Sequence, residues 1–291
     1  MKILVTGAKG QLASEISSVL KKGKTDIGYI DKLYSNAEVK YLGRNELDIA
    51  RFSDVLNCVE DFRPDVIINC AAYTNVDGCE ENFDSAFKVN SIGPRNLARS
   101  ASITGARLIH VSTDYVFDGK GSVPFREYDV PKPMSVYGRT KLLGEQYIRE
   151  NCRKYFIVRT SWLYGVYGKN FVYTILKAAR EKGHLDVVDD QRGNPTNAED
   201  LAYHILKIAL TNEYGIYHCT GKGECSWYDF AGKIVDYAGI DCSVSPITSD
   251  KLERAAKRPE YSSLDNMMLR CTIGDDMRPW KDALKSFIEK I

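Results

Sequence analysis

The feature that most constrains the fold is a strand, a glycine turn and a helix at the start of the chain. Lys2 to Thr6 is a short β-branched apolar run, and apolar residues recur at helical spacing from Leu12 to Leu20. Gly7 and Gly10 allow a tight turn between them, and the small Ala13 allows the helix to pack closely on the strand. The amides that open such a helix can face a pyrophosphate. The segment therefore predicts dinucleotide binding, with a plain turn between strand and helix as the alternative.

Strand-like and helical patterns alternate along the first 160 residues. Continuous apolar runs, typical of strands buried on both faces, cover 64–72, 107–117 and 155–160, and a helical pattern covers 84–101. Such alternation is the signature of strands connected by crossover helices. The sequence therefore predicts an α/β fold built on a doubly wound parallel sheet of the Rossmann type.

Beyond residue 160 this rhythm breaks down. Helices are predicted at 171–182, 200–210, 226–238 and 280–291, and short strands at 185–188 and 215–219. We expect a dinucleotide-binding domain over residues 1–160, completed by a return strand and helix near 190–220. Residues 161–190 and 221–291 are expected to form a smaller C-terminal substrate-binding lobe that covers the strand ends.

The position of the second strand bears on the choice of cofactor. If Asp26 to Ile30 is the strand, Asp31 lies where an acid that binds the ribose of NAD is expected. If Glu38 to Leu42 is the strand, Arg44 follows it and can pair with the 2′-phosphate of NADP. We favour the second assignment. Asp48, a little further on, is either a helix cap or a contact to the adenine side of the cofactor.

Polar or small residues stand where two of the buried strands end. Ser112, Thr113 and Asp114 follow one apolar run, and Ala71 and Ala72 end another. Ligands of open parallel sheets bind at the carboxyl ends of the strands, so the polar residues are well placed for chemistry and the alanines let a cofactor approach the backbone. The alternative for Asp114 is a turn in which its side chain bonds its own backbone.

Tyr137 and Lys141 stand four positions apart, just after a turn at Pro131 and Pro133. Residues at this spacing share one face of a helix. An ammonium beside a phenol lowers the pKa of the phenol, as a proton donor or acceptor near neutral pH requires. The alternative is an ordinary solvated helix face with a half-buried tyrosine.

Charge and cysteine usage narrow the class of protein. The 291 residues carry 40 basic and 39 acidic side chains, which gives no electrostatic reason to expect nucleic acid or an anionic membrane as a partner. The first residues do not resemble a signal peptide, so we expect a soluble cytoplasmic protein. The eight cysteines form no C-x-x-C pair and the four histidines are isolated, so no metal site is predicted.

With these residues in view, the chain resembles the extended short-chain dehydrogenase/reductase family over nearly its whole length. The resemblance is carried by several motifs in order: Gly7-x-x-Gly10-Gln11-Leu12, Leu47-Asp48-Ile49, Asn69-Cys70-Ala71-Ala72-Tyr73-Thr74-x-Val76-Asp77, Ser112-Thr113-Asp114-Tyr115-Val116-Phe117-Asp118-Gly119, Tyr137-Gly138-x-Thr140-Lys141, Arg159-Thr160-Ser161-Trp162-Leu163-Tyr164-Gly165, Asp190-Gln191-x-Gly193-x-Pro195-Thr196 and Lys257-Arg258-Pro259-x-x-Ser262. Ala13 departs from the family's usual third glycine.

The resemblance implies an enzyme that reduces the C4 ketone of a nucleotide-linked deoxy sugar. Its catalytic set falls on Thr113, Tyr137 and Lys141. Tyr137 is implied as the proton donor, Thr113 as a hydrogen-bond donor to the same oxygen, and Lys141 as the group that lowers the Tyr137 pKa and grips the nicotinamide ribose. The implied cofactor is NADPH, with NADH as the alternative.

The resemblance also implies two sets of binding residues. The cofactor set consists of Gly7, Gly10, Gln11, Leu12, Arg44, Asp48, Ile49, Ala71, Ala72, Tyr73, Asn90, Tyr137 and Lys141. The substrate set consists of Val76, Asp114, Tyr115, Trp162, Asn170 and Arg258. The aromatic ring of Trp162 suits the apolar face of a hexose, and the forked guanidinium of Arg258 suits a diphosphate. Their alternative roles are a core or lid residue and a surface charge.

Two other functions are compatible with the same superfamily. One is a non-catalytic, NADP-sensing subunit that associates with methionine adenosyltransferase, although a pure regulator has no use for an intact proton-transfer set. The other is an epimerase or dehydratase, although dehydratases add an acidic pair beside the threonine and Asp114 supplies only one acid.

Some relatives bind magnesium at a dimer interface through glutamates. Glu15 matches one of them, but its C-terminal partner is not evident, so we expect no required metal, and a homodimer is the expected assembly.

Overall fold

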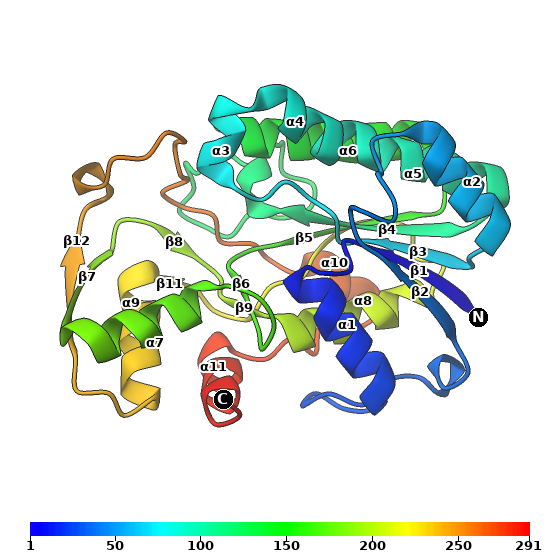
Figure 1. Ribbon diagram of the computed structural model, residues 1–291. Coiled ribbons are helices and arrows are strands. Elements are labelled where there is room, and N and C mark those ends of the chain that lie inside the picture. Colours follow the sequence, from blue (N-terminus) through cyan, green and yellow to red (C-terminus); the bar gives the residue numbers. More distant parts are fainter.

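The computed structural model describes residues 1–291, and its centre is a six-stranded parallel sheet (Figure 1). The strand order is β10-β5-β4-β3-β1-β2, and every neighbouring pair runs parallel. The strands are β1 (Lys2–Thr6), β2 (Glu38–Leu42), β3 (Val66–Asn69), β4 (Arg107–Thr113), β5 (Tyr155–Thr160) and β10 (Gly215–His218). The predicted α/β fold with a parallel central sheet is confirmed.

Helices cover both faces of this sheet (Figure 1). One face carries α2 (Phe52–Phe62), α5 (Gly93–Thr104) and α6 (Val136–Asn151), and the other carries α1 (Gln11–Lys22), α8 (Ala198–Ala209) and α10 (Met267–Thr272). Leu4 packs into the core under α2 and α5, whereas Ile3 and Val5 pack into the core under α1 and α8. Successive residues of a strand point to opposite faces, so β1 serves both cores.

The helix predicted over 84–101 is divided into three pieces. These are α4 (Phe83–Phe87), a π-helical turn η2 (Lys88–Ile92) and α5. Pro94 opens α5 and has no N–H to donate to the carbonyl of Asn90, so the regular ladder is interrupted there. The wide turn buries Asn90 completely and turns its amide toward the backbone of Tyr73.

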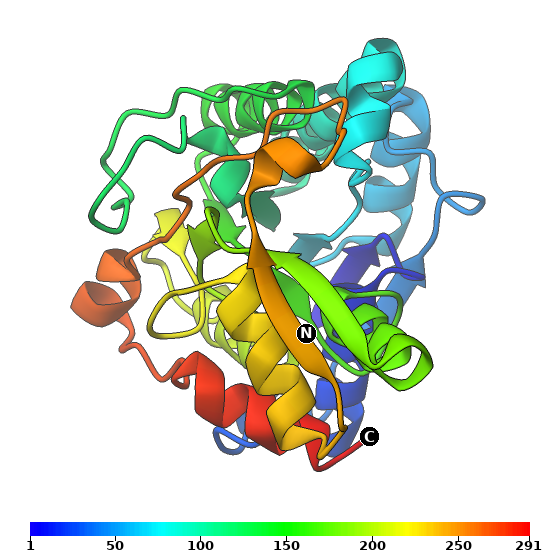
Figure 2. The ribbon, with the colours of Figure 1, turned by 90° about the vertical axis from the view of Figure 1, so that its left-hand side faces the viewer.

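The C-terminal lobe lies beside the sheet in Figure 1 and faces the viewer in Figure 2. Its core is built around aromatic side chains. It contains α7 (Phe171–Lys182), α9 (Trp227–Tyr237), α11 (Trp280–Ile288) and a parallel pair of strands, β7 (His184–Val188) and β12 (Ser243–Ile247). Strand β12 was not predicted, because Pro246 interrupts an already polar stretch. The remaining short elements are α3 (Val76–Glu81), β6 (Leu163–Tyr164), β8 (Arg192–Gly193), β9 (Thr196–Asn197), β11 (Cys225–Ser226), η1 (Lys32–Tyr34), η3 (Asp114–Val116) and η4 (Ser249–Lys251). No helix combines the length and the apolar character needed to cross a membrane.

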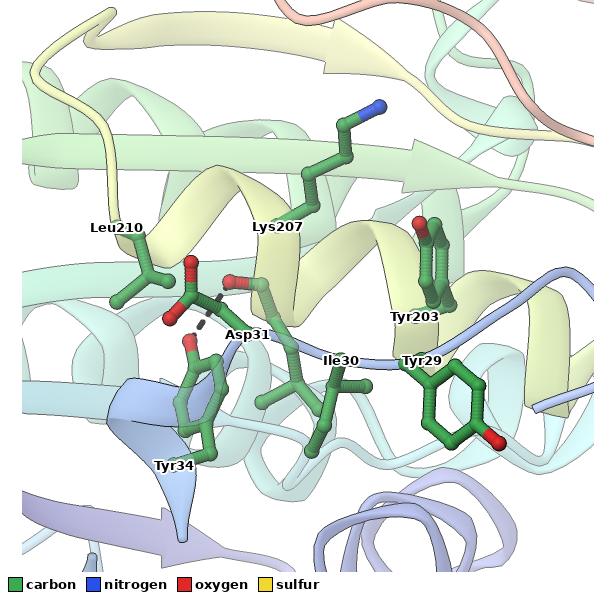
Figure 3. Close-up of a pocket in the computed structure, with 8 residues that line it drawn as sticks. Tyr29, Ile30, Asp31, Tyr34, Tyr203, Lys207 and Leu210 are labelled. Carbon is green, nitrogen blue, oxygen red and sulfur yellow. Dashed lines mark hydrogen bonds between the residues drawn. The ribbon is translucent and has the colours of Figure 1, made fainter. Parts of the chain in front are cut away.

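The second strand is Glu38–Leu42, as favoured from the sequence. The competing segment forms only an isolated bridge between Lys24 and Tyr29. Asp31 caps the short helix η1 by accepting a hydrogen bond of 2.8 Å from the Leu33 amide. Figure 3 shows it in a pocket against α8, and none of the residues that line this pocket belongs to the predicted site. The disfavoured alternative, in which Asp31 binds the cofactor ribose, is therefore wrong, because the strand that would have placed it there does not form.

Candidate active site

A cleft of about 600 Å³ opens at the carboxyl ends of β1, β3, β4 and β5. Eleven of the predicted site residues line it: Gly10, Gln11, Leu12, Ala72, Val76, Thr113, Asp114, Tyr115, Tyr137, Lys141 and Trp162. The other predicted residues, Gly7, Arg44, Asp48, Ile49, Ala71, Tyr73, Asn90, Asn170 and Arg258, do not line this cleft. The pocket of Figure 3, about 320 Å³, shares no residue with it.

The glycine turn forms one wall of the cleft. Gly7 has φ +72°, and a Cβ at this position would stand 2.7 Å from the Ala71 amide nitrogen, so only glycine fits. Gly10 precedes α1 in an extended conformation, and no side chain caps the helix. The first turn of α1 also lacks acidic residues. The open amides and the helix dipole therefore suit the pyrophosphate of a dinucleotide.

The three predicted cofactor residues that follow β2 lie in different environments. Arg44 is exposed and makes no ion pair, so its guanidinium is available to a ligand phosphate. Asp48 accepts a hydrogen bond of 3.0 Å from the Ala50 amide in a local turn, and the N-cap of α2 is Arg51, so the helix-cap alternative for Asp48 is wrong. Ile49 is 5% exposed and belongs to the core under α2 and α5.

Asn90 and Tyr73 form a support beneath the cleft. The Asn90 amide accepts from the Tyr73 nitrogen at 2.8 Å and donates to the Tyr73 oxygen at 3.1 Å. It also donates to the Thr140 hydroxyl on α6 at 3.2 Å. Asn90 thus fixes the backbone that follows β3 against the helix that carries Tyr137 and Lys141.

Thr113 and Asp114 form the polar end of β4. The Thr113 hydroxyl donates to Asp114 Oδ1 at 2.9 Å and accepts from the Tyr115 amide at 3.2 Å. Burial raises the pKa of the Asp114 carboxyl to about 6, although hydrogen bonds from the Ser262 and Thr113 hydroxyls favour its ionised form. A carboxyl in this state can exchange a proton near neutral pH.

Helix α6 delivers Tyr137 to the cleft. Ser135 caps the helix by accepting from the Gly138 amide at 3.1 Å. Gly138 packs against the Tyr115 carbonyl so closely that a Cβ would overlap the oxygen. This contact brings the Tyr137 ring to 5.5 Å from the Tyr115 ring in an edge-on arrangement. The absent Cβ is what lets α6 lie directly against the end of β4.

Lys141 lines the cleft but is only 2% exposed, and its ammonium is held against strand β4. Its Nζ donates to the Val111 carbonyl at 2.6 Å and stands 3.2 Å from His110 Nε2. Burial lowers the pKa of Lys141 to about 8. No carboxylate contacts Nζ directly, so a buried charge here is only partly compensated.

The pKa of Tyr137 differs from the expectation. Burial raises it, and the opposing hydrogen bond to Thr113 is the smaller effect. Lys141 was expected to lower this pKa, but its ammonium is engaged by Val111 and His110 instead. The phenol is therefore protonated at neutral pH, as a proton donor must be, but it is a weaker acid than the expected lowered pKa would make it.

Two tryptophans form the wall on the lobe side. Trp162 adopts φ +45°, an unusual backbone conformation for a bulky residue, and its ring stacks on Trp227 with centroids 3.5 Å apart and planes within 8°. Trp227 lines the cleft too. It was not predicted as a site residue, although its position next to the helix-capping Ser226 was visible in the sequence.

Arg258 and Asn170 connect the lobe to the cleft. Arg258 forms a bidentate pair with Asp77 on α3, with distances of 2.6 and 2.7 Å. This guanidinium holds the Asp77 pKa down at about 2. Asn170 caps α7 and donates to Gln11 Oε1 at 3.0 Å, which joins the lobe to the glycine turn. Arg258 is thus neither a solvated surface charge nor, in this structure, free for a ligand.

Glu15 lies in a small pocket with a second carboxylate and two lysines. Glu15 faces Glu199, and burial followed by this second carboxylate raises the Glu15 pKa to about 7. Lys22 and Lys290 line the same small pocket, and Lys290 Nζ lies 3.3 Å from Glu199. The structure contains no group of three or more side chains arranged to hold a metal ion.

Comparison with known proteins identifies the family of this chain. A dTDP-4-dehydrorhamnose reductase from Aggregatibacter actinomycetemcomitans is 40% identical over 98% of this chain and 97% of its own. The spore coat polysaccharide biosynthesis protein SpsK of Bacillus subtilis is 39% identical over 99% and 97%. Among solved structures, a dTDP-4-dehydrorhamnose reductase from Clostridium acetobutylicum superposes with a TM-score of 0.94 at 47% identity, over 100% of this chain and 99% of that one. One from Bacillus anthracis, in complex with NADP, gives 0.91 at 39% identity over the same shares. Residues 1–291 match the RmlD substrate binding domain family, and the chain belongs to that family.

Proposed function

We propose that this protein is a dTDP-4-dehydrorhamnose reductase, an oxidoreductase that uses NADPH to reduce the C4 ketone of dTDP-4-dehydro-L-rhamnose to dTDP-L-rhamnose. One observation carries the proposal. Thr113, Tyr137 and Lys141 meet in the cleft beside an uncapped glycine turn, in a chain that matches the family over its full length. The relatives that bear this name support the choice of substrate.

The residues of the first 160 positions would hold the cofactor. The proposed contacts are Gly7, Gly10, Gln11, Leu12, Arg44, Asp48, Ile49, Ala71, Ala72, Tyr73, Asn90, Tyr137 and Lys141. The unpaired Arg44 supports NADPH over NADH, because a guanidinium beside β2 favours a phosphorylated ribose. The bound cofactor supplies the hydride. NADH remains the alternative coenzyme.

The protein's own contribution is to supply a proton and stabilise the oxygen that receives it. Tyr137 donates its phenolic proton to the C4 oxygen, and the Thr113 hydroxyl turns from Asp114 Oδ1 to donate a hydrogen bond to the same oxygen. Burial keeps the Tyr137 proton in place until that oxygen gains negative charge. Removing the Thr113 hydroxyl would weaken the reaction without removing the proton donor.

The lobe of residues 161–190 and 221–291 would hold the nucleotide sugar together with three residues that follow strand ends of the first domain. Val76, Asp114, Tyr115, Trp162, Asn170 and Arg258 are the proposed contacts. The Trp162 ring offers an aromatic face to the apolar side of the hexose. Arg258 would exchange Asp77 for the diphosphate, since a guanidinium fork bonds either anion in the same way.

The decisive experiment follows the absorbance of reduced cofactor with purified protein and dTDP-4-dehydro-L-rhamnose, with NADPH and NADH in parallel. Stoichiometric oxidation of NADPH supports the reductase. Turnover without net consumption of cofactor would identify an epimerase or dehydratase, because those enzymes regenerate it. A stoichiometric protein partner and no ketosugar turnover would point to the regulatory subunit instead.

The cytoplasmic location and the homodimer are also proposals. Cell fractionation tests the cytoplasmic location. Size-exclusion chromatography with light scattering tests the homodimer. The balanced charge supports a small-molecule substrate rather than nucleic acid or membrane lipid as the partner.

A further inference from the structure

A row of polar side chains crosses the sheet beneath Lys141. Thr6, Asn69 and His110 stand at the same level of the adjacent strands β1, β3 and β4. All three are at most 1% exposed. They lie on the face that α6 covers, because each stands two residues after a core residue of that face. The row therefore ends against the lysine of the proposed catalytic set.

The orientation of the Asn69 amide is fixed by a backbone donor. The Ala71 N–H points at Asn69 Oδ1 at 3.1 Å, and the Thr6 hydroxyl bonds the same oxygen at 2.7 Å. A backbone N–H only donates, so the atom it faces must be the oxygen. The Asn69 nitrogen is then left to face His110 Nδ1, at 2.9 Å.

This amide selects one tautomer of His110. Burial, and then the charge of Lys141, lowers the His110 pKa far below its usual value, so the ring is neutral. A neutral imidazole has one donor and one acceptor nitrogen. Since the Asn69 nitrogen donates, Nδ1 accepts and the hydrogen lies on Nε2. That hydrogen points toward Lys141 Nζ, 3.2 Å away.

An ammonium cannot accept this hydrogen, whereas an amine can. The remaining groups around Lys141 do not reverse the preference. The Glu145 carboxylate favours the charged form of Lys141, but this carboxylate is already bound by Arg159 and Ser112. The buried Cys70 thiol has a raised pKa and stays neutral. The Val111 carbonyl accepts a hydrogen from either form of the lysine.

We propose that Asn69 and His110 are positioning residues for Lys141: the fixed imidazole donates from Nε2 toward Nζ, favours the amine and so makes Lys141 a readier proton source for Tyr137. The inference rests on the proposed function. After Tyr137 has given its proton to the product oxygen, an N–H bond of Lys141 breaks and the phenolic O–H forms again, through a water or hydroxyl in the cleft. The amine then recovers its proton from solvent.

The wild-type protein provides the first test. Nitrogen-15 NMR of labelled histidine distinguishes the two neutral tautomers, and the His110 signal is assigned by its loss in His110→Phe. We expect the hydrogen on Nε2. A hydrogen on Nδ1 would overturn the proposal. The variant serves only to assign the signal, and the tautomer itself is measured on the wild-type protein.

Asn69→Asp provides the second test. The carboxylate can accept from Thr6, Ala71 and His110 together, which moves the imidazole hydrogen to Nδ1 and offers Nε2 to the ammonium. The midpoint of the Lys141 ¹⁵Nζ titration should rise by about one pH unit or more. The kcat should fall by up to about tenfold, the equivalent of one pKa unit, with the KM for the sugar nucleotide unchanged. An unchanged lysine midpoint contradicts the proposal.

Thr6→Val is the matched control. It removes the hydroxyl on the far side of Asn69 and leaves the contact between Asn69 and His110 in place. We expect lower stability, the same tautomer and the same Lys141 midpoint. Both NMR measurements are independent of the substrate, so an absence of ketosugar turnover would refute the proposed function without touching the tautomer.

Discussion

Lys141 and Glu145 lie one turn apart on α6, and both are almost fully buried, at 2% and 1% exposed. Their charges are satisfied very differently. Arg159 binds Glu145 through two nitrogens, at 3.0 and 2.7 Å, and the Ser112 hydroxyl adds a third bond at 2.5 Å. Lys141 has only a carbonyl and an imidazole. The fully paired charge holds α6 to the sheet, and the under-paired one is left able to lose its proton.

The comparison agrees with the general behaviour of buried charges. A buried ion is tolerated when its partners replace the lost hydration, and its pKa shifts when they do not. Lys141 shows such a shift, to about 8. Substitutions on the cleft side of α6 should therefore change chemistry more than stability, and substitutions at the ion pair should do the reverse.

The largest effect is expected from Tyr137→Phe. Loss of the phenolic proton should lower kcat by about 10²–10⁴-fold, the usual contribution of a general acid. Cofactor affinity and the urea midpoint should stay close to wild type, because only the hydroxyl is removed. The rate is measured by NADPH oxidation at saturating substrate. Near-normal turnover would remove Tyr137 from the mechanism.

Glu145→Gln should be the most destabilising change. It leaves the Arg159 guanidinium buried without its anion, at a cost of about 3–5 kcal/mol in the free energy of unfolding. Urea denaturation at pH 7 measures it. The matched control is Glu150→Gln on the exposed side of α6, which should change stability by about 0.5 kcal/mol or less. Equal losses in the free energy of unfolding would show that the pairing of Glu145 with Arg159 does not stabilise the fold.

Lys141→Met should show that the buried charge of Lys141 lowers the free energy of unfolding, and that this cost disappears as pH rises. The pKa of Lys141 falls from 10.5 to about 8 on folding, so between these pH values the unfolded chain binds more protons than the folded one. Wild-type stability should therefore rise relative to Lys141→Met as pH increases from 8 toward 10.5, by at most about 3 kcal/mol. Below pH 8 the difference should be constant.

This third prediction is checked by urea denaturation of both proteins at pH 7.5 and 9.5. The difference between the two proteins cancels the titration of tyrosines and cysteines elsewhere. If both proteins respond to pH identically, Lys141 has an ordinary pKa and the contrast with Glu145 disappears.

Arg44→Ser extends the contrast to two arginines. Arg44 is exposed and makes no ion pair, whereas Arg159 is buried and paired with Glu145. Loss of a charge-assisted bond to a 2′-phosphate should weaken NADPH binding by about 1.5–3 kcal/mol, while NADH binding and stability stay the same. Titration calorimetry with both coenzymes measures the change. Equal losses for NADPH and NADH would place Arg44 away from the 2′-phosphate.

Much of the fold was predictable because it depends on local patterns. The apolar runs placed β1, β3, β4 and β5, and the glycine spacing placed the turn before α1. Two predicted strands extend beyond the observed ones: β3 ends at Asn69 and β4 ends at Thr113. At both positions the side chain accepts a hydrogen bond from the backbone two residues further on. The π-helical turn at Asn90 was missed because its cause, a proline one turn later, interrupts the helix without ending it.

By itself, the sequence determined which strands end at the cleft, because parallel strands bring their carboxyl ends to one edge of the sheet. The family resemblance placed Thr113, Tyr137 and Lys141 together, and all three line that cleft. Only the tertiary structure decided what those groups face. The stack of Trp227 on Trp162, the pairing of Arg258 with Asp77 and the approach of His110 to Lys141 join residues from 31 to 181 positions apart. Burial, which no local pattern measures, set the direction of the Tyr137 pKa. Protonation states depend on neighbours and lost hydration, and both are properties of the folded chain.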